Sequence, residues 1–562
     1  MNNFFNYTKR NNEELFNSMN QENMQLNTCQ NYIPIYQTFF DINNSNYNSF
    51  NLNHRFYLNL IKEPINYSIY NSEIIDSSLN EVVNNECFIK FSPLIDPCKY
   101  LAGKFNNLNL YDLPKLNNEP IANFNRPNNF AYVDSIFSFL SSVLLNKFNF
   151  IHGINFYGSY IAIKNNYKYD IKDDLDYLED NKFFNENLNK DFKIVNMEKN
   201  DIFKYSSKKN KLYLDIKNEE IDLNLDNLDE LQQVDKLICA NTPSLTEENL
   251  ALIYNSEPIS QTKNTTSSSS CSSRTSNTLS ITTEEKSMEE KSMEEDSDSE
   301  TDSSNDEELF VNINRFPVCA IALEKCDNTL DYLLENDEIE DKGLTSCFFQ
   351  IILTLLVYQK TLGFSHNDLH TNNIMYIETD KPYLYYFYKD RYYKVPTYNK
   401  IFKIIDFGRA SYNIGKEFLI SDCFGPDGDA ATQFNIPPYY NEKKKRVDIN
   451  YSFDLCRLGC SLLDFFIEDL DEIDNLRKES KVFKMISDWC LDDNNKNILY
   501  KKNGDERYPN FKLYKMITRT VNRWTPETEI DRDIFTPYKV SRKRIQKNAK
   551  IMNVEKLIEF FK

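Results

Sequence analysis

The chain contains little glycine and little histidine for its length. Its 562 residues include 11 glycines and four histidines. No glycine precedes Gly103, so the first part of the chain cannot hold a glycine-rich phosphate loop of the usual form. The twelve cysteines include no C-x-x-C pair. We therefore expect reduced and mostly buried thiols, as in a cytosolic protein.

Long apolar runs are also missing. No stretch approaches the roughly 18 uninterrupted apolar residues that span a membrane. The N-terminus, which reads M-N-N-F-F, has no apolar signal-peptide core. The most apolar helical segment, at residues 348–358, is too short to cross a bilayer. These absences predict a soluble intracellular protein with no membrane partner.

Basic clusters are scarce, and the acidic charge is concentrated. The formal net charge is -20, but residues 284–308 alone contain thirteen acidic residues against two lysines. The rest of the chain is only mildly acidic. A nucleic-acid-binding surface needs clustered lysine and arginine. We therefore expect no specific nucleic-acid partner.

Residues 261–308 form a low-complexity segment rich in serine and acids. It contains a serine run at 267–270 and a tandem E-E-K-S-M repeat at 284–288 and 289–293. Such a segment cannot bury enough apolar surface to offset its ordering entropy, so we expect it to be disordered. Acids flank Ser297, Ser299, Ser303 and Ser304. The tract is either a solvated spacer or a phosphorylated docking segment.

What is present indicates a globular protein of mixed structure. Hydrophobic residues make up 41% of the chain and aromatic residues 14%, and the length allows more than one domain-sized core. Steps of three and four separate Phe130, Val133, Phe137, Leu140 and Leu144, which predicts an amphipathic helix. Residues 150–163 are apolar and interrupted by two glycines, which predicts a pair of strands.

Two motifs carry most of the functional information. Residues 366–373 read H-N-D-L-H-T-N-N, and residues 404–408 read I-I-D-F-G. Together they resemble the catalytic loop and the metal-binding D-F-G motif of the protein-kinase-like superfamily. The wording F-I-K-F-S-P-L at 88–94 and S-F-D-L-C-R-L-G at 452–459 is similar to divergent serine/threonine protein kinases of large DNA viruses.

This resemblance implies an α+β fold with two lobes, a small β-rich N-lobe and a mainly helical C-lobe. We expect the N-lobe to contain a large, partly disordered insertion. The expected divisions are a polar, Asn-rich extension that is partly ordered at best (1–65), the first part of the N-lobe (66–163), the insertion (164–312), the last N-lobe strand and hinge (313–330), the C-lobe (331–540) and a basic C-terminal tail (541–562).

The resemblance also implies a reaction. Asp368 would act as the catalytic base toward Ser/Thr hydroxyls of a protein substrate, with ATP as phosphate donor. Asn373 and Asp406 would hold Mg²⁺. Glu324 and Cys326 lie where a hinge offers backbone groups to adenine, and Leu323 precedes them as the residue guarding the pocket.

The lysine that grips the ATP phosphates has two candidates. Lys90 precedes the predicted helix, on which Asp134 replaces the usual glutamate partner. Lys164 lies in I-A-I-K, which is closer to the usual wording, but it follows Gly158 too closely for a phosphate-binding hairpin. We favour Lys90 paired with Asp134. Phe88 then stands where a small residue normally lies against adenine, which predicts a tight or altered nucleotide pocket.

Other departures leave alternatives open. Asn367 replaces the arginine that usually precedes the catalytic aspartate, which makes switching by loop phosphorylation less favourable. His370 replaces a lysine that touches the γ-phosphate in serine/threonine kinases, which favours a small-molecule phosphotransferase. The missing glycine loop favours a nucleotide-binding pseudokinase scaffold. The leading prediction is an intracellular Ser/Thr protein kinase, located in the cytoplasm of a host cell or in a virion.

Overall fold

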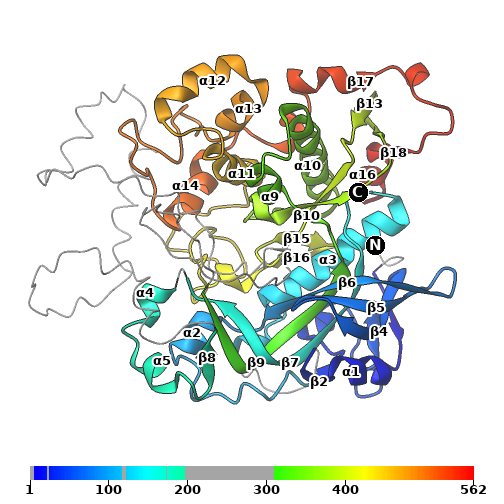
Figure 1. Ribbon diagram of the computed structural model, residues 1–562, viewed down its shortest axis with the longest axis vertical. Coiled ribbons are helices and arrows are strands. Elements are labelled where there is room, and N and C mark those ends of the chain that lie inside the picture. Colours follow the sequence, from blue (N-terminus) through cyan, green and yellow to red (C-terminus); the bar gives the residue numbers. More distant parts are fainter. Residues whose placement is uncertain (1–4, 22–23, 117–121, 173, 196–308, 562) are drawn as a thin grey trace, which may run out of the picture. The chain divides into compact units, whose positions relative to one another are not determined.

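The structure is a computed structural model that describes residues 5–21, 24–116, 122–172, 174–195 and 309–561 (Figure 1). It is mixed in composition, with 33% of the described residues in helices and 27% in strands. This composition is consistent with the α+β class expected from the sequence. The low-complexity tract at 261–308 lies outside the described residues, as does most of the predicted insertion.

A seven-stranded antiparallel sheet dominates the first half of the described chain. The order along its main path is β2-β7-β9-β6-β5-β4, and β8 pairs with β9. Along β6, Cys87 and Ile89 are buried on one face, so the alternating Phe88 and Lys90 point to the other. The strands are β2 (Leu26–Gln30), β4 (Phe56–Pro64), β5 (Ile69–Asp76), β6 (Glu81–Pro93), β7 (Phe156–Asp170), β8 (Phe192–Ile194) and β9 (Phe310–Glu324).

The predicted helix is confirmed as α3 (Phe130–Phe148), which packs against β7 and β9. It is not amphipathic, because every residue from Ala131 to Leu144 is buried. Asn129 caps its first turn by accepting a hydrogen bond from the Ala131 backbone N–H. Asn149 ends it in a left-handed conformation. The positions predicted to face the core from Val133 to Leu144 are buried. Asp134 is buried on the same helix, next to the strand that carries Lys90.

The expectation that residues 1–65 are partly ordered at best differs from the structure. The described residues of this segment form β1 (Tyr7–Lys9), α1 (Glu13–Met19), β2, the 3-10 turn η1 (Pro34–Thr38), β3 (Phe50–Leu52) and β4. Met19, Leu26 and Ile33 are fully buried. The ring of Phe50 stacks on that of Tyr7 with centroids 4.2 Å apart. Asparagine-rich turns separate these apolar residues, which concealed their pattern in the sequence.

The predicted strand pair at 150–163 is one strand instead. β7 continues past Lys164 to Asp170 and pairs with β9 along its length, from Phe156 opposite Leu323 to Asp170 opposite Phe310. The insertion therefore does not begin at residue 164. Two short helices, α4 (Leu175–Leu178) and α5 (Lys182–Asn187), and β8 follow β7 within the described residues.

The second half of the chain is mainly helical. α10 runs from Asp341 to Leu362, longer than the apolar segment predicted, and ends at Gly363 in a left-handed conformation. Among the described helices only α10 is long and apolar enough to cross a membrane, and 83% of that apolar window is buried inside the protein. It is a core helix. Around it lie α9 (Leu330–Glu335), α11 (Phe453–Leu463), α12 (Ile473–Glu479), α13 (Lys481–Trp489), α14 (Lys512–Thr520) and α15 (Pro526–Glu529).

Smaller sheets hold the loops that follow α10. β10 (Asn328–Thr329), β11 (Ile374–Glu378) and β14 (Lys400–Ile404) form one sheet, and β15 (Ser411–Ile414) pairs with β16 (Glu417–Ile420). Between β11 and β14 the chain makes a hairpin of β12 (Tyr383–Tyr388) and β13 (Arg391–Pro396).

The C-terminal residues predicted as a basic tail are part of the fold. β17 (Lys539–Val540) pairs with β13, and β18 (Ile551–Asn553) pairs with β12 in parallel. The last helix, α16 (Val554–Phe561), packs on α10 and β12 (Figure 1). Its Phe560 and Phe561 contact Phe148 at the end of α3, with ring centroids 4.8 and 5.4 Å apart. The C-terminus thus supports the helix that carries Asp134.

His152 gives a test of this packing. It is fully buried, and its ring nitrogens lie 2.9 Å from the Phe402 carbonyl oxygen and 2.8 Å from the Tyr386 hydroxyl. Burial lowers the pKa of His152 to about 4 from its ordinary 6.5. Between these values the unfolded state binds more protons, so the free energy of unfolding falls as pH falls. We expect His152→Gln to remove about 3 kcal/mol of the change in unfolding free energy between pH 6.5 and pH 4.

Urea unfolding at several pH values measures this effect. Above pH 7 the contribution of His152 ionisation is absent, so the free energies of unfolding of the parent and the variant should change with pH in parallel. Parallel pH dependence down to pH 4 would contradict a neutral, buried His152.

Candidate functional site

A largely buried cluster of three charged side chains joins distant parts of the chain. Lys90 on β6 lies 2.6 Å from the Asp134 Oδ2 atom on α3 and 2.8 Å from the Asp406 Oδ1 atom after β14. Burial alone would lower the pKa of Lys90, but the two carboxylates raise it above its ordinary value. Asp134 also accepts a hydrogen bond from the Phe407 backbone N–H through its other oxygen, at 3.0 Å. The helix, the strand and the D-F-G segment therefore meet at Lys90.

Lys164, the alternative lysine, lies elsewhere. Its ammonium group donates hydrogen bonds to the carbonyl oxygens of Met24 and Asn165, at 2.9 and 3.2 Å. It also lies over the ring of Tyr67. The structure therefore brings Lys90, and not Lys164, to Asp406.

Asp454, near the start of α11, holds the loop at residues 366–373 in place through hydrogen bonds. The two carboxylate oxygens of Asp454 accept hydrogen bonds from the backbone N–H groups of His366 and Asn367, both at 2.9 Å. Asp454 therefore caps the backbone of this loop. Asn367 has a positive φ of 64°, which is uncommon for a residue other than glycine. Its side-chain amide donates a hydrogen bond to the Arg409 carbonyl oxygen at 2.9 Å. At position 367, where kinases usually have an arginine, this chain therefore has a neutral side chain that connects the loop to the segment after the D-F-G motif.

Asn373 is placed to bind a ligand. Its amide nitrogen donates to the Asp368 carbonyl oxygen and contacts the His370 Nε2 atom, both at 3.0 Å. The Asn373 Oδ1 atom is buried and has no hydrogen-bond partner among the described residues. A buried acceptor without a partner is costly, and a bound cation would satisfy it. Burial lowers the pKa of His370 to about 4.

Asp406 and Asn373 fit Mg²⁺ better than they fit zinc. Within the described ranges there is no group of three His, Cys, Asp or Glu side chains that could hold a metal ion. Zinc sites need such a set. Mg²⁺ is usually held by one or two oxygen side chains together with substrate phosphates and water. Asp406 adopts a positive φ of 63°, the kind of backbone strain that is concentrated at functional sites.

An apolar cavity lies beside the charged cluster. Small-molecule sites are usually lined in this way, by apolar side chains with a few polar groups. Leu323, Glu324 and Cys326 line it, as the sequence led us to expect of a hinge. The side chain of Glu324 forms an ion pair with Lys403. The other lining residues are Phe88, Lys90, Asp134, Ser138, Ile154, Lys325, Thr329, Met375, Ile405, Asp406 and Phe407.

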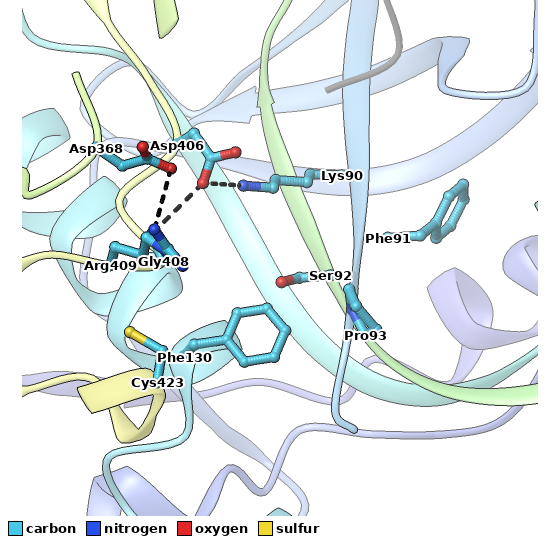
Figure 2. Close-up of a pocket in the computed structure, with 10 residues that line it drawn as sticks. All are labelled: Lys90, Phe91, Ser92, Pro93, Phe130, Asp368, Asp406, Gly408, Arg409 and Cys423. Carbon is cyan, nitrogen blue, oxygen red and sulfur yellow. Dashed lines mark hydrogen bonds and ion pairs between the residues drawn. The ribbon is translucent and has the colours of Figure 1, made fainter. Parts of the chain in front are cut away.

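A second cavity, drawn in Figure 2, shares Lys90 and Asp406 with the first and has a volume of about 480 Å³. In Figure 2 the side chains of Asp368, Asp406 and Lys90 point toward a common space. Phe130 and Cys423 close the opposite wall. The predicted base, metal ligand and lysine are therefore neighbours, although they come from the loop before β11, the segment after β14 and β6.

Sequence reasoning missed the side chains that surround Asp368. The Tyr514 hydroxyl, on α14, donates a hydrogen bond to the Asp368 Oδ1 atom at 2.7 Å. Arg457, on α11, donates to that hydroxyl at 2.9 Å. Arg409 lies 3.9 Å from the Asp368 Oδ2 atom. Arg457 and Arg409 fall within or beside the quoted motifs and could have been noticed. Tyr514 lies in a segment without a motif and gave no signal.

Comparison with known proteins gives partial matches. No family model matches the chain. A "putative serine/threonine-protein kinase" of Acanthamoeba polyphaga mimivirus is 29% identical over 154 residues, 25% of this chain and 38% of that protein. A "probable kinase" of Invertebrate iridescent virus 3 is 34% identical over 83 residues, 15% of this chain and 16% of that protein. The chain thus spans less than two thirds of either relative. These similarities support a kinase-like relationship.

The contact between Tyr514 and Asp368 can be tested by stability. Tyr514→Phe leaves the buried Asp368 and Arg457 side chains each short of one hydrogen bond. We expect a loss of about 1–3 kcal/mol in the free energy of unfolding, measured by urea denaturation. Tyr440→Phe is the matched control, because Tyr440 is 45% exposed. Equal effects of the two substitutions would contradict the hydrogen bond to Asp368.

Proposed function

We propose that the chain is an ATP-dependent protein kinase that transfers the γ-phosphate to Ser/Thr hydroxyls. The observation that carries the proposal is that Lys90, Asp368 and Asp406, from three separate segments of the chain, line one cavity, while the Asn373 amide is hydrogen-bonded to the Asp368 carbonyl oxygen. The kinase-like similarity to the two viral proteins is consistent with it. We further propose that the large sheet with α3 is the small lobe of a kinase fold, and that the region around α10 is the large lobe.

The apolar cavity accounts for nucleotide binding in this proposal. Adenine would lie among Phe88, Leu323 and Met375, with its polar edge toward the backbone of residues 324–326. Phe88 narrows the cavity where kinases usually carry a small residue. The triphosphate would extend toward Lys90, whose ammonium group is held in place by two carboxylates.

The same residues would hold a metal ion. Asn373 Oδ1 and the Asp406 carboxylate are the proposed ligands of Mg²⁺, which supplies charge neutralisation at the phosphate oxygens when bound. Asp454 and Asp134 act indirectly, because they fix the backbones of the loop and of the D-F-G segment. The unpartnered Asn373 Oδ1 atom supports this assignment.

Asp368 is the proposed base. The acceptor hydroxyl oxygen attacks the γ-phosphorus, the bond between that phosphorus and the β–γ bridging oxygen breaks, and ADP leaves. The hydroxyl proton passes to the Asp368 carboxylate. The hydrogen bond from the Tyr514 hydroxyl to its Oδ1 atom would orient this carboxylate.

Phosphate transfer tests this proposal. We expect the purified full chain to transfer the γ-phosphate of ATP to itself, casein or myelin basic protein when Mg²⁺ is present. Asp368→Asn should lower the rate at least about 100-fold, because it removes the proton acceptor. Asp380→Asn, an exposed position, is the control. Nucleotide binding without transfer would indicate the scaffold, and transfer only to small molecules would indicate the other alternative.

A second test separates the two lysines. Lys90→Met removes the phosphate-binding cation, so we expect the thermal stabilisation by Mg·ATP to fall to near zero. Lys164→Met also replaces a buried lysine, but one that lies away from Asp406. Its melting temperature should still rise with Mg·ATP as it does in the parent, whatever its starting value. An unchanged response of Lys90→Met, or loss of the response in Lys164→Met, would contradict the assignment of Lys90.

A further inference from the structure

The loop that carries Asp368 has no cationic side chain. Residues 366–373 include neither lysine nor arginine. At the position of the usual lysine, His370 uses its Nε2 atom to contact the Asn373 amide at 3.0 Å. The γ-phosphoryl group gathers charge on its oxygens during transfer, and kinases place cations there. In this chain such a cation has to come from outside the loop.

Arg409, the residue after the D-F-G motif, lies at the required place. Its guanidinium group is 3.9 Å from the Asp368 Oδ2 atom. It lines the 480 Å³ cavity together with Lys90, Asp368 and Asp406 (Figure 2). Lys90 reaches this space from the side opposite Arg409. A phosphoryl group near Asp368 would therefore have one cation on each side.

The surroundings hold Arg409 in one conformation. Its guanidinium forms an ion pair with Asp429, in the segment after β16. Its carbonyl oxygen accepts a hydrogen bond from the Asn367 amide at 2.9 Å. The rings of Tyr514 and Phe511 lie 5.7 and 5.8 Å from the guanidinium carbon. Arg409 is buried, with 5% of its surface exposed. A cation that is fixed before substrate arrives needs no reorganisation during the reaction.

We propose that Arg409 is a further catalytic residue, whose guanidinium group contacts the transferring phosphoryl group and replaces the missing cation of the catalytic loop. This inference rests on the proposed kinase function. Arginine suits the role, because its planar fork of donors matches two phosphate oxygens and stays charged at any physiological pH. It exchanges no proton.

A purely structural role is the competing explanation. The ion pair with Asp429 would then serve only to hold the segment after β16 against the loop. The two roles differ in what a neutral residue at position 409 does to the transition state. They also differ in the effect of Asp429→Asn, which removes the ion pair but leaves the guanidinium group.

The experiment compares full-length Arg409→Gln, Arg409→Lys and Asp429→Asn with the parent. The first measurement is kcat and KM for ATP in the transfer assay. The second is the affinity for Mg·ADP with and without aluminium fluoride, which mimics the transferring phosphoryl group. We expect Arg409→Gln to lower kcat about 100- to 1,000-fold, with KM changed less than about threefold. Aluminium fluoride should no longer tighten ADP binding to this variant.

The other variants keep the test decisive. Arg409→Lys preserves charge and should recover part of kcat, even if Arg409→Gln folds poorly. Asp429→Asn should lose less than about tenfold in kcat and keep the tightening by aluminium fluoride. Equal losses in Arg409→Gln and Asp429→Asn, with the tightening intact in both, would overturn the inference and leave only the structural role. Parental kcat in Arg409→Gln would overturn it too. A parent that binds no nucleotide would overturn the proposed function itself.

Discussion

The buried contact of Lys90 with Asp134 and Asp406 is the interaction on which the rest of the site depends. It is the point where β6, α3 and the D-F-G segment meet. Removing one member of a buried ion pair typically costs about 3–5 kcal/mol, because the remaining charge is left without compensation. The net stability gained from the cluster is small, because the cost of removing the three charges from water offsets their attraction. Its main effect is to fix the relative positions of the three segments. With two carboxylates and one ammonium group, it also carries an excess of negative charge that a bound cation would offset.

Apolar packing and backbone hydrogen bonds align the remaining parts with this cluster. The ring of Phe137 on α3 stacks on Phe364, with centroids 4.2 Å apart, and lies 4.6 Å from that of Phe407. Phe407 in turn follows Asp406. From the other side, Asp454 holds the loop through the N–H groups of His366 and Asn367. A shift of α3 would therefore be transmitted both to the lysine and to the D-F-G segment.

Short-range patterns in the sequence were enough to find the centre of the site. Asp368, Asn373 and Asp406 lie in two motifs, and the kinase resemblance paired Lys90 with Asp134 on the helix that the apolar spacing predicted. Tyr514 could not be found this way, because its contact with Asp368 spans 146 positions and depends on how α14 packs. The order within residues 1–65 was missed for a different reason. Single apolar side chains there are separated by asparagine-rich turns and become a core only when β2 pairs with β7.

The most direct test of the account is an experimental structure of the full chain with Mg²⁺ and a non-hydrolysable ATP analogue. The account predicts adenine between Phe88 and Met375, phosphates at Lys90, and Mg²⁺ bound by the Asn373 Oδ1 atom and Asp406. The γ-phosphate should lie between Lys90 and Arg409. An analogue bound elsewhere, or a nucleotide in the cavity with its phosphates directed away from Asp368, would contradict the central claim.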